Sequence, residues 1–415
     1  MNLIVSILYN LGIHILSFIL KLLTNFNTKI KLGVVGRSKT FSVLERSINT
    51  TDKTLWFHCS SLGEYEQGLP VFEVLRKKYP QHKIVLSFFS PSGYEIRKNS
   101  KIADVVVYLP LDTKANAKRF LELVHPEFTV FVKYDIWPNL LLELKRRNGR
   151  AILISALFRK NQSYFKLYGG KRKTALFAFE HIFVQNENSK ALLNSIHYNS
   201  VSISGDTRFD RVSNQLLQDN QLDFISEFKD NSTCIVIGSS WPEDETILAP
   251  YINKYASKDL KFIIAPHEIK SNHIKSIVSK LNVDTVLFSD KDNKQLSDYS
   301  VFVIDTIGLL SKIYSYADIA YVGGAMGQTG LHNILEPATF GVPIIIGKNH
   351  SKFPEAYTMI KDAGVTSVKS ENELKTALDS FVSSSEYCKS IGHKNSEFIK
   401  KSKGAVVQIS NYIRI

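Results

Sequence analysis

The stretch that decides the fold is Leu55–Gly68, with the sequence LWFHCSSLGEYEQG. Its first five residues are mostly large apolar types that favour a strand, and a helix is predicted from Glu64 to Tyr79. A buried strand that leads into a helix begins a βαβ unit, and such units build parallel sheets. We therefore expect residues 60–64 to lie at the carboxyl end of a strand, where α/β sheets bind ligands.

The same alternation of short apolar runs and helical patterns continues along the chain. Strands are predicted at 55–59, 83–88, 105–108, 129–132, 151–154, 182–185 and 201–204, and again at 234–238, 262–265, 301–304, 319–322 and 343–346. Residues 205–231 between the two sets are polar and mostly lack strands. The pattern predicts two Rossmann-like domains that face each other across a cleft, residues 33–212 and residues 213–415, the second with a C-terminal helix.

Residues 1–32 form a hydrophobic segment whose apolar part, residues 3–23, is long enough to cross a bilayer. No Lys or Arg precedes it and no small-residue cleavage site follows, which argues against a signal peptide. Its polar residues fall on one helical stripe: Ser6, Asn10, His14, Ser17 and Lys21. The stripe suits a helix in the membrane interface or one whose polar side packs on protein. If the helix spans, the lysines that follow place the rest of the chain in the cytoplasm. A buried helix of a soluble protein is the alternative.

The chain carries 52 Lys and Arg against 39 Asp and Glu, a net charge of +13 over 415 residues. This excess favours anionic partners, which include nucleic acids, anionic membranes and phosphorylated substrates. The sequence has neither a zinc finger nor an aromatic-rich ribonucleoprotein motif, so we expect no nucleic-acid partner. Its three cysteines lie far apart and predict neither a disulfide framework nor a zinc site.

Two acidic residues of the first domain follow predicted strands and could face the cleft. Glu64 could remove a proton from an acceptor hydroxyl, or it could only favour the helix dipole. Asp135 could lie beside it, or could cap the helix that Pro138 begins. A basic cluster with neighbouring aromatic residues could bind a phosphorylated amphiphile, or could be a solvated helix face; it consists of Lys166, Lys171, Arg172 and Lys173.

In the second domain, Gly323 and Gly324 follow a strand and begin a glycine-rich loop that leads to a helix. Backbone N–H groups there suit a phosphate, and Glu336 could accept hydrogen bonds from a ribose diol. The alternative is a plain connection in which Asn333 caps the helix. Two further polar loops follow strands at the same sheet edge, and they contain Ser239, Pro266 and His267. The acidic pair around Lys291 lies in a polar loop, so we predict no metal there.

Taken together, these motifs resemble the 3-deoxy-D-manno-octulosonic acid (Kdo) transferases of lipopolysaccharide synthesis. In the first domain the shared motifs are Trp56-Phe57-His58, Ser61-Leu62-Gly63-Glu64, Ser90-Pro91-Ser92-Gly93-Tyr94-Glu95, Tyr108-Leu109-Pro110-Leu111-Asp112 and Trp137-Pro138-Asn139. In the second they are Asp305-Thr306-Ile307-Gly308, Val322-Gly323-Gly324, His332-Asn333 and Leu335-Glu336-Pro337-Ala338. The motifs occur in order through most of the chain after the apolar segment.

The resemblance implies a GT-B glycosyltransferase with two Rossmann-like domains and an N-terminal membrane-associated helix. It further implies an inverting transfer of Kdo from CMP-Kdo to a lipid A precursor, at the cytoplasmic face of the inner membrane, without a metal or other cofactor. By similarity Glu64 is the general base and Asp135 a second acidic position. Contacts to CMP-Kdo are expected from Ser239, Pro266, His267, Gly323, Gly324, Asn333 and Glu336. Contacts to the acceptor are expected from Ser61, Gly63, Ser92 and the basic cluster.

Four residues depart from those usual in the family, namely Lys133, His267, Leu309 and Leu331. Two other functions stay open at this point. One is a different GT-B enzyme, such as a sugar-nucleotide epimerase, which would need a uridine donor and no lipid acceptor. The other is a non-catalytic membrane-bound sensor that binds a nucleotide sugar without releasing CMP.

Overall fold

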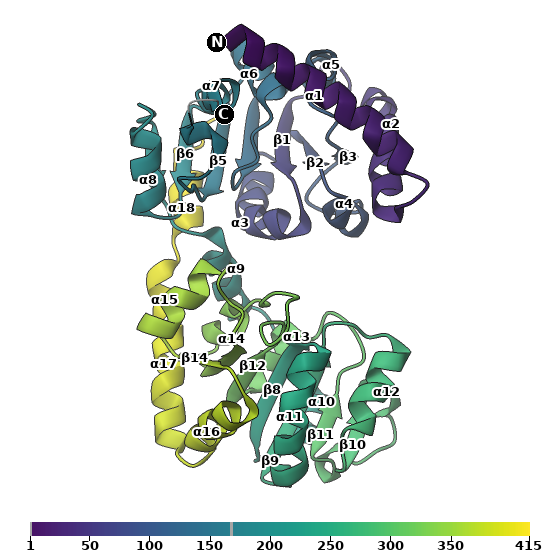
Figure 1. Cartoon of the computed structure of the whole chain (residues 1–415), viewed down its shortest axis with the longest axis vertical. Helices are drawn as coiled ribbons and strands as arrows, with labels where there is room; N and C mark the ends of the chain where they lie inside the picture. Colours follow the sequence, from purple (N-terminus) through teal and green to yellow (C-terminus); the bar gives the residue numbers. More distant parts are fainter. Residues whose placement is uncertain (1, 167–168) are drawn as a thin grey trace. The chain divides into compact units, whose positions relative to one another are not determined.

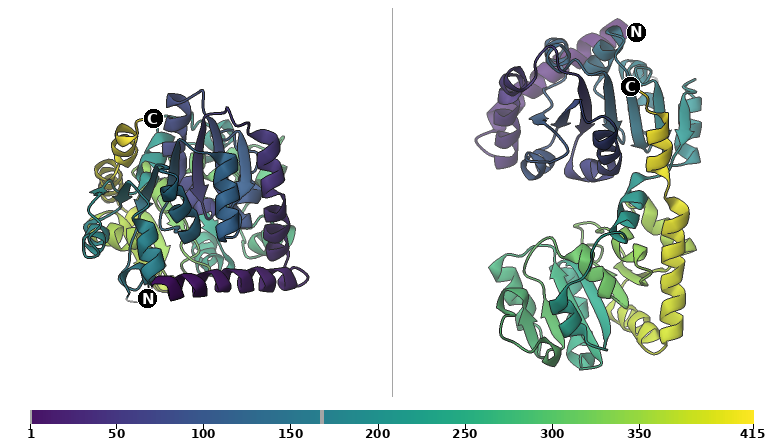
Figure 2. Two further views of the ribbon diagram at one scale, coloured as in Figure 1. Left: turned by 90° about the horizontal axis from the view of Figure 1, so that it is seen from above. Right: turned by 180° about the vertical axis from the view of Figure 1, so that it is seen from behind.

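The computed structural model describes residues 2–166 and 169–415, which divide into two compact units. Unit 1 comprises residues 1–211 and 403–415, and unit 2 comprises residues 212–402. Each unit is a seven-stranded sheet in which every strand pair is parallel, with helices on both faces (Figures 1 and 2). The two predicted Rossmann-like domains are confirmed.

The sheet of unit 1 has the order β3-β2-β1-β4-β5-β6-β7. Its strands are β1 Thr54–Cys59, β2 Lys83–Phe88, β3 Val105–Tyr108, β4 Phe128–Val132, β5 Ala151–Ala156, β6 His181–Val184 and β7 Val201–Ile203. Its helices are α1 Asn2–Leu23, α2 Thr28–Ser47, α3 Leu62–Lys78, α4 Pro91–Arg97, α5 Lys114–Val124, α6 Pro138–Arg146, α7 Gly170–Leu176, α8 Glu187–Asn194 and α18 Ala405–Tyr412, with α9 Thr207–Gln215 at the boundary. The strands are buried because large apolar residues pack on both faces.

The sheet of unit 2 has the order β10-β11-β9-β8-β12-β13-β14. Its strands are β8 Thr233–Ser240, β9 Leu260–Pro266, β10 Thr285–Leu287, β11 Val301–Val303, β12 Ile319–Val322, β13 Ile344–Gly347 and β14 Val365–Val368. Its helices are α10 Asp223–Lys229, α11 Pro242–Tyr255, α12 Ser271–Ser279, α13 Leu310–Ile313, α14 Leu335–Thr339, α15 Pro354–Asp362, α16 Glu371–Val382 and α17 Ser385–Ser402. The short edge strands β10 and β14 were not predicted from the sequence.

Each sheet has a switch point where strands that continue in opposite directions lie side by side, between β1 and β4 in unit 1 and between β8 and β12 in unit 2. On either side of such a point the connecting chains leave in opposite directions, so the carboxyl ends of the two strands stay uncovered. The loops and first helical turns that follow these strands contain half of the predicted site residues, among them Glu64, Asp135, Gly323 and Gly324. Strand order therefore brings together residues that are far apart in the sequence.

The last helix, α18, belongs to unit 1, which corrects the predicted second domain of residues 213–415. Ile409 and Ile413 are fully buried in the core beside β6 and α3, so apolar packing draws the helix there. Asp210 accepts a hydrogen bond from the N–H of Gly404 at 2.9 Å and so holds the beginning of the helix. Lys78 donates to the carbonyl oxygen of Ile413 at 2.8 Å, just beyond its end.

Helix α1 lies along unit 1 with one side uncovered, and α2 follows it (Figures 1 and 2). Residue 32, the expected end of the apolar segment, lies inside α2. Residues 6–23 of α1 are long and apolar enough to cross a membrane by length and composition, and only 6% of them are buried. The exposed large apolar side chains of α1 are Ile7, Leu8, Leu11, Ile15, Leu16, Phe18, Ile19, Leu22 and Leu23.

The opposite side of α1 is fixed to unit 1 by hydrogen bonds. Tyr9 donates to Oδ2 of Asp112 at 2.7 Å, and the side-chain amide of Asn139 donates to Oδ1 of Asn10 at 2.8 Å. Asp112 also accepts from the backbone N–H groups of Asn139 and Leu140, at 2.9 and 2.8 Å. Part of the predicted polar stripe therefore packs on protein, as one of the sequence-based alternatives proposed.

Candidate active site

The unit 1 part of the site lies where β1 and β4 end side by side. The chain after β1 passes through Ser60 and Ser61 into α3, and the chain after β4 passes through Asp135 and Trp137 into α6. These strands pair in parallel, so the two loops leave the same edge of the sheet. As a result the hydroxyl of Ser60 donates directly to the carboxylate of Asp135.

Asp135 is held as a carboxylate by donors from three directions. Its Oδ2 accepts from Nε2 of His58 at 2.5 Å and from the indole N–H of Trp137 at 2.9 Å, in addition to Ser60. Burial alone would raise the pKa of Asp135, but the His58 ring and these three hydrogen bonds outweigh it and lower that pKa below its usual range. Asp135 is therefore ionised at neutral pH and is a poor proton acceptor.

A chain of hydrogen bonds sets the orientation of His58, which is fully buried in β1. The indole N–H of Trp56 donates to the Ser87 hydroxyl at 2.8 Å, and that oxygen lies 2.8 Å from Nδ1 of His58. Because an ionised Asp135 can only accept, Nε2 of His58 donates to it, while the Ser87 hydroxyl can donate to Nδ1 or to the carbonyl oxygen of Phe57 at 3.5 Å. His58 thus connects Asp135 to the sheet interior. From the sequence, His58 and Ser87 were placed in predicted strands. Both polar side chains are fully buried and therefore need hydrogen-bond partners, which the sequence alone did not reveal.

Glu64 lies in the first turn of α3 and takes part in its capping box with Ser61. Its Oε2 accepts the backbone N–H of Ser61 at 3.0 Å. Burial raises the pKa of Glu64, and the charge of nearby Asp135 raises it further, against opposing effects of His58 and Lys133. Glu64 therefore combines the helix-capping role with an environment that makes its carboxylate more basic.

Both predicted roles of Glu64 are compatible because the capping bond uses one carboxylate oxygen. A Cβ built on the neighbouring Gly63 would meet no atom within 4 Å, so open space lies beside the first turn of α3. Gly63 is inside the helix without a positive φ, so the turn itself does not require glycine. Two neighbouring carboxylates whose pKa values are pushed in opposite directions form the arrangement in which acid–base roles are divided.

Of the predicted acceptor residues, Ser61 and Gly63 are neighbours of Glu64 in the chain, and Ser92 lies in a turn that packs against the loop before α3. A Cβ on Gly93 would come within 3.1 Å of the backbone carbon of Ser61, so the turn that begins α4 packs against the loop before α3. The hydroxyl groups of Ser90 and Ser92 lie 2.9 Å apart in that turn. The structure thus brings the turn that contains Ser92 against the loop that contains Ser61.

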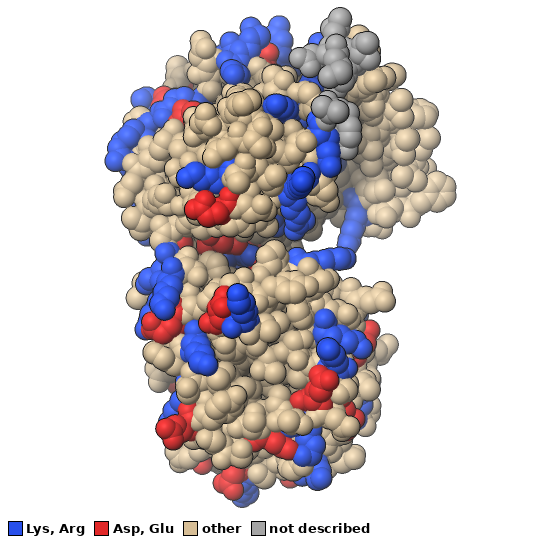
Figure 3. Space-filling view, turned by 60° about the vertical axis from the view of Figure 1, so that its left-hand side comes forward, with Lys and Arg blue, Asp and Glu red and all other residues tan. Residues whose placement is uncertain are grey.

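The basic cluster divides into one buried and three more accessible side chains. The ammonium group of Lys171 is buried and donates to Oδ1 of Asn139 at 2.6 Å, with the ring of Tyr9 4.6 Å away. Lys171 is therefore part of the attachment of α1, which corrects the prediction that it contacts the acceptor. Lys166 and Arg172 are exposed and Lys173 is half-buried. On the face shown in Figure 3, Lys and Arg predominate on unit 1, whereas both signs are interspersed on unit 2.

In unit 2, the glycine-rich loop after β12 is held tightly against the end of β8. A Cβ on Gly323 would approach the carbonyl oxygen of Ser239 to 2.4 Å, so the close approach of these two backbone segments requires glycine at residue 323. Gly324 has a φ of +93°, and its Cβ would lie 2.1 Å from the carbonyl oxygen of Gly330. Both glycines are explained by close backbone packing.

The expected phosphate contacts from these two glycines are corrected by the structure. The N–H of Gly323 donates to the Gly238 carbonyl at 2.9 Å, and that of Gly324 donates to Oδ2 of Asp244 at 2.8 Å. The Asp244 carboxylate also accepts from Tyr321 at 2.7 Å and from the N–H of Trp241 at 3.0 Å. The N–H group of Gly324, which was expected to bind the substrate phosphate, thus donates to the carboxylate of Asp244 instead.

Three rings form a stack beside this loop. Trp241 and His267 stack with centroids 4.8 Å apart, and His267 lies 4.3 Å from His332. The indole N–H of Trp241 donates to Nε2 of His332 at 3.0 Å. Burial, together with the charge of His267, lowers the pKa of His332 to about 4, so this ring is neutral near pH 7 and accepts the indole proton. His267 is exposed, and Pro266 before it ends β9.

Asn333 and Glu336 form a second polar group in unit 2. The side-chain amide of Asn333 donates to Oε1 of Glu336 at 2.9 Å, while its oxygen accepts the N–H of Leu335 at 3.2 Å. Asn333 therefore holds the beginning of α14 and orients the Glu336 carboxylate at the same time. The predicted neighbours are brought together, along with Ser239 and the ring stack, around the ends of β8, β9 and β12.

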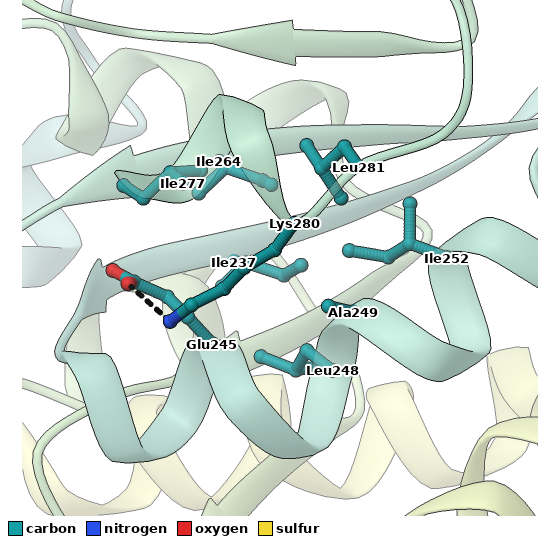
Figure 4. Close-up of a pocket in the computed structure, with 9 residues that line it drawn as sticks. All are labelled: Ile237, Glu245, Leu248, Ala249, Ile252, Ile264, Ile277, Lys280 and Leu281. Atoms are coloured by element: carbon teal, nitrogen blue, oxygen red, sulfur yellow. Dashed lines mark ion pairs between the residues drawn. The ribbon is translucent and has the colours of Figure 1, made fainter. Parts of the chain in front are cut away.

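A small void under α11 is not part of this site (Figure 4). It has a volume of about 10 Å³ and is lined mainly by aliphatic side chains, with Glu245 and Lys280 3.9 Å apart at its side. That volume is close to the space that one water molecule needs. The acidic pair around Lys291 is exposed, and Lys291 and Lys294 each form an ion pair with one of its members. Within residues 2–166 and 169–415, no three His, Cys, Asp or Glu side chains are grouped as a metal site requires.

Comparisons with known proteins agree with the resemblance read from the motifs. Residues 35–211 match the family model described as 3-deoxy-D-manno-octulosonic-acid transferase (kdotransferase). A Haemophilus influenzae protein named 3-deoxy-D-manno-octulosonic acid transferase is 27% identical over 375 residues, which cover 87% of this chain and 86% of that protein. The protein of that name from Aquifex aeolicus is 28% identical over 354 residues, 83% of this chain and 91% of the relative.

Solved structures with both units show the same fold. UDP-GlcNAc 2-epimerase from Neisseria meningitidis matches with a TM-score of 0.59 at 17% identity, and covers 84% of this chain and 99% of that one. MurG from Acinetobacter baumannii matches with a TM-score of 0.54 at 11% identity, and covers 87% and 99%. At such identities the likeness establishes the GT-B fold alone.

Proposed function

We propose that this chain is a 3-deoxy-D-manno-octulosonic acid transferase, like the family model and the relatives that it matches, and that it transfers Kdo from CMP-Kdo to a lipid A precursor with inversion. The observation that carries the proposal is the pair Glu64 and Asp135 at the switch point of unit 1. Glu64 lies beside open space with a raised pKa, and Asp135 is fixed as an anion next to it. An acceptor hydroxyl needs such a base, because it must lose its proton as it attacks.

The proposed reaction is a single displacement. The acceptor oxygen forms a bond to the anomeric carbon of Kdo while the bond from that carbon to the phosphate oxygen of CMP breaks. The electron pair of the broken bond stays on the CMP phosphate, and the acceptor proton moves to Glu64. Asp135 remains ionised throughout and keeps Glu64 basic through its charge. The donor CMP-Kdo is a substrate, and the reaction as proposed uses neither a metal nor another cofactor.

Unit 2 holds the nucleotide in this proposal. The rings of Trp241, His267 and His332 provide a flat aromatic surface, and the Asn333–Glu336 pair provides a carboxylate oriented to accept from a ribose diol. Because the N–H groups of Gly323 and Gly324 are used within the protein, the phosphate must be bound by other groups. The exposed ring of His267 lies at the end of β9, where it can donate to a phosphate.

The acceptor would be reached at a membrane surface. The uncovered side of α1 is almost continuously apolar, and such a surface on a helix of a folded unit suits the boundary between headgroups and acyl chains. The exposed Lys166 and Arg172 suit anionic headgroups. We place the catalytic units at the cytoplasmic face of the inner membrane, with CMP-Kdo, the lipid acceptor and anionic lipid as partners, and without nucleic acid.

The direct test is incubation of the full chain with CMP-Kdo and a lipid A precursor, followed by mass analysis of the lipid and measurement of released CMP. We expect the lipid to gain the mass of Kdo while an equal amount of CMP appears. CMP release that does not depend on the acceptor, or an unchanged lipid, would contradict the proposal. The fold is shared with UDP-GlcNAc 2-epimerases, so UDP-GlcNAc is the matched control. Its isomerisation by this chain would favour the epimerase alternative.

A further inference from the structure

A cavity of about 300 Å³ lies between α1, α2 and the loop that precedes α5. We call it the α1–α2 cavity. It is lined by Ser17, Leu20, Lys21, Val34, Arg37, Ser38, Phe41, Pro110, Leu111, Thr113 and Asn116. Its volume is at the lower end of the range of small-molecule sites in proteins. It is separate from the carboxylates of the proposed active site, since neither Glu64 nor Asp135 lines it.

The lining combines apolar side chains with two cationic ones. Leu20, Val34 and Phe41 are apolar, whereas Lys21 and Arg37 carry positive charge. Among the described residues, no carboxylate forms an ion pair with either cation. A site of this composition favours a ligand with an anionic group and a short apolar part.

Arg37 is held by two backbone carbonyl oxygens and an aromatic ring, and not by a carboxylate of the described residues. Its Nη2 donates to the carbonyl oxygen of Phe89 at 2.5 Å and its Nε donates to that of Leu109 at 3.2 Å. The guanidinium also lies 4.4 Å from the centre of the Phe89 ring. These contacts hold the Arg37 side chain in place but leave its positive charge without a negative partner. A bound anion would neutralise that charge.

Gly33 makes this position of Arg37 possible. A Cβ at residue 33 would lie 2.8 Å from Nη1 of Arg37, so a larger residue on α2 would displace the guanidinium. The N-terminal end of α5 adds further positive character, because Thr113 caps that helix and lines the cavity together with Asn116. The cation, the helix end and the space beside them therefore belong to one site.

The two helices that enclose the cavity also carry many of the exposed large apolar residues of unit 1. Leu16, Ile19 and Leu23 of α1 are exposed, Phe26 after it is 86% exposed, and Val35 of α2 is exposed. In the membrane attachment proposed above, lipid headgroups would surround this part of the chain. The ligand chemistry available there is a phosphate joined to hydrocarbon.

We propose that the α1–α2 cavity binds one anionic phospholipid of the membrane, with its phosphate at Arg37 and Lys21 and its first methylenes against Leu20, Val34 and Phe41. This lipid is distinct from the acceptor of the transfer reaction. It would fill the space beside α1 and so fix that helix on unit 1 in the membrane-bound state. The inference rests on the proposed membrane attachment, but not on the transfer chemistry.

The test uses the full chain in detergent, titrated with dihexanoyl phosphatidylglycerol and, separately, with dihexanoyl phosphatidylcholine, and observed by native mass spectrometry. We expect saturable binding of one phosphatidylglycerol per chain and much weaker binding of the zwitterionic lipid. Ser38→Trp should fill the cavity without a change of charge and reduce phosphatidylglycerol binding at least about tenfold, whereas the exposed Lys31→Gln should leave it nearly unchanged. Lys21→Gln should weaken it as well, because one charge-assisted contact is lost.

Three outcomes of the binding experiment would overturn the inference. They are no saturable binding of phosphatidylglycerol, equal binding of the two lipids, and full binding by Ser38→Trp. A measurement of Kdo transfer to a detergent-dispersed acceptor shows whether a change in the cavity also affects the active site. Ser38→Trp should retain wild-type transfer, and a parallel loss of transfer and of lipid binding would assign the cavity to the acceptor instead. If the wild-type chain binds the lipid but does not transfer Kdo, the cavity stands and the proposed function fails.

Discussion

Replacement of Glu64 by Gln is the most direct perturbation of the proposed chemistry. Gln has the same shape as Glu and its amide oxygen can still accept the N–H of Ser61, a bond of 3.0 Å in the native protein. Capping boxes use Gln as well as Glu at this position, so we expect the free energy of unfolding to change by less than about 1 kcal/mol. Only the ability to take a proton is lost.

The expected loss follows from the size of general-base effects. Such groups contribute roughly 10²- to 10⁴-fold, which corresponds to about 2.7–5.4 kcal/mol of transition-state stabilisation. We therefore expect Glu64→Gln to reduce the rate of Kdo transfer at least about a hundredfold. The donor is held by unit 2 in the proposal, so CMP binding should remain at the wild-type level. Circular dichroism and thermal unfolding check that the variant is folded.

The pH dependence gives an independent check on the same carboxylate. Glu64 acts as a base only when it is ionised, so the rate should fall as the pH drops through its pKa. Burial and Asp135 raise that pKa, so the fall should occur at a higher pH than for an ordinary Glu. Asp135→Asn removes the neighbouring negative charge, and we expect the acidic limb of the profile to move to lower pH.

The assay is the initial rate of CMP release in the presence of a lipid A precursor, measured over a range of pH for the wild type and both variants. Turnover of Glu64→Gln within about threefold of the wild-type rate would refute the assignment of the base, given the expected minimum of about a hundredfold. An acidic limb that does not move in Asp135→Asn would refute the electrostatic coupling, even if Glu64 proved essential.

Three further predictions concern α1, the glycine loop and the metal requirement. Asn139→Ala removes the side chain that joins Asn10 to Lys171, and should lower the free energy of unfolding by about 1–3 kcal/mol, measured by chemical denaturation, because buried polar partners lose their bonds. Gly324→Ala should cost about 1–3 kcal/mol and weaken CMP binding in calorimetry, since its φ of +93° and the Gly330 carbonyl exclude a Cβ. A chelator should not change the transfer rate, whereas strong inhibition reversed by a divalent ion would contradict the proposed metal-free reaction.

Much of the fold could be predicted because its signals are local. Buried parallel strands are continuous apolar runs, and the helices between them follow at regular intervals, so most strands of both sheets were predicted within a few residues. The short edge strands β10 and β14 were missed, although the equally short edge strands β3 and β7 were predicted. The return of α18 to unit 1 was missed because it depends on packing of Ile409 and Ile413 against residues far away in the sequence.

The site was predictable to the extent that it follows from strand ends. Glu64 and Asp135 were predicted in this way, and their proximity follows from the pairing of β1 with β4. The role of His58 depends on Ser87 in the neighbouring strand β2, a contact that no local pattern shows. The hydrogen bond from the Gly324 N–H to Asp244 could not be predicted either, because in the sequence Asp244 resembles any acidic residue in a first helical turn.

The segment from Asp135 to Asn139 connects the proposed chemistry to the attachment of α1. Trp137 donates to Asp135, and two residues later Asn139 binds Asn10 of α1 and the buried Lys171. Pro138 between them begins α6 and restricts the backbone of this turn. A displacement of α1 would remove the bond from Asn139 to Asn10 but leave its bonds to Asp112 and Lys171, and so act on the turn that positions Trp137. The same short turn thus holds the helix with the exposed apolar face and orients the carboxylate beside the proposed base, which gives a physical reason why both features occur in one unit.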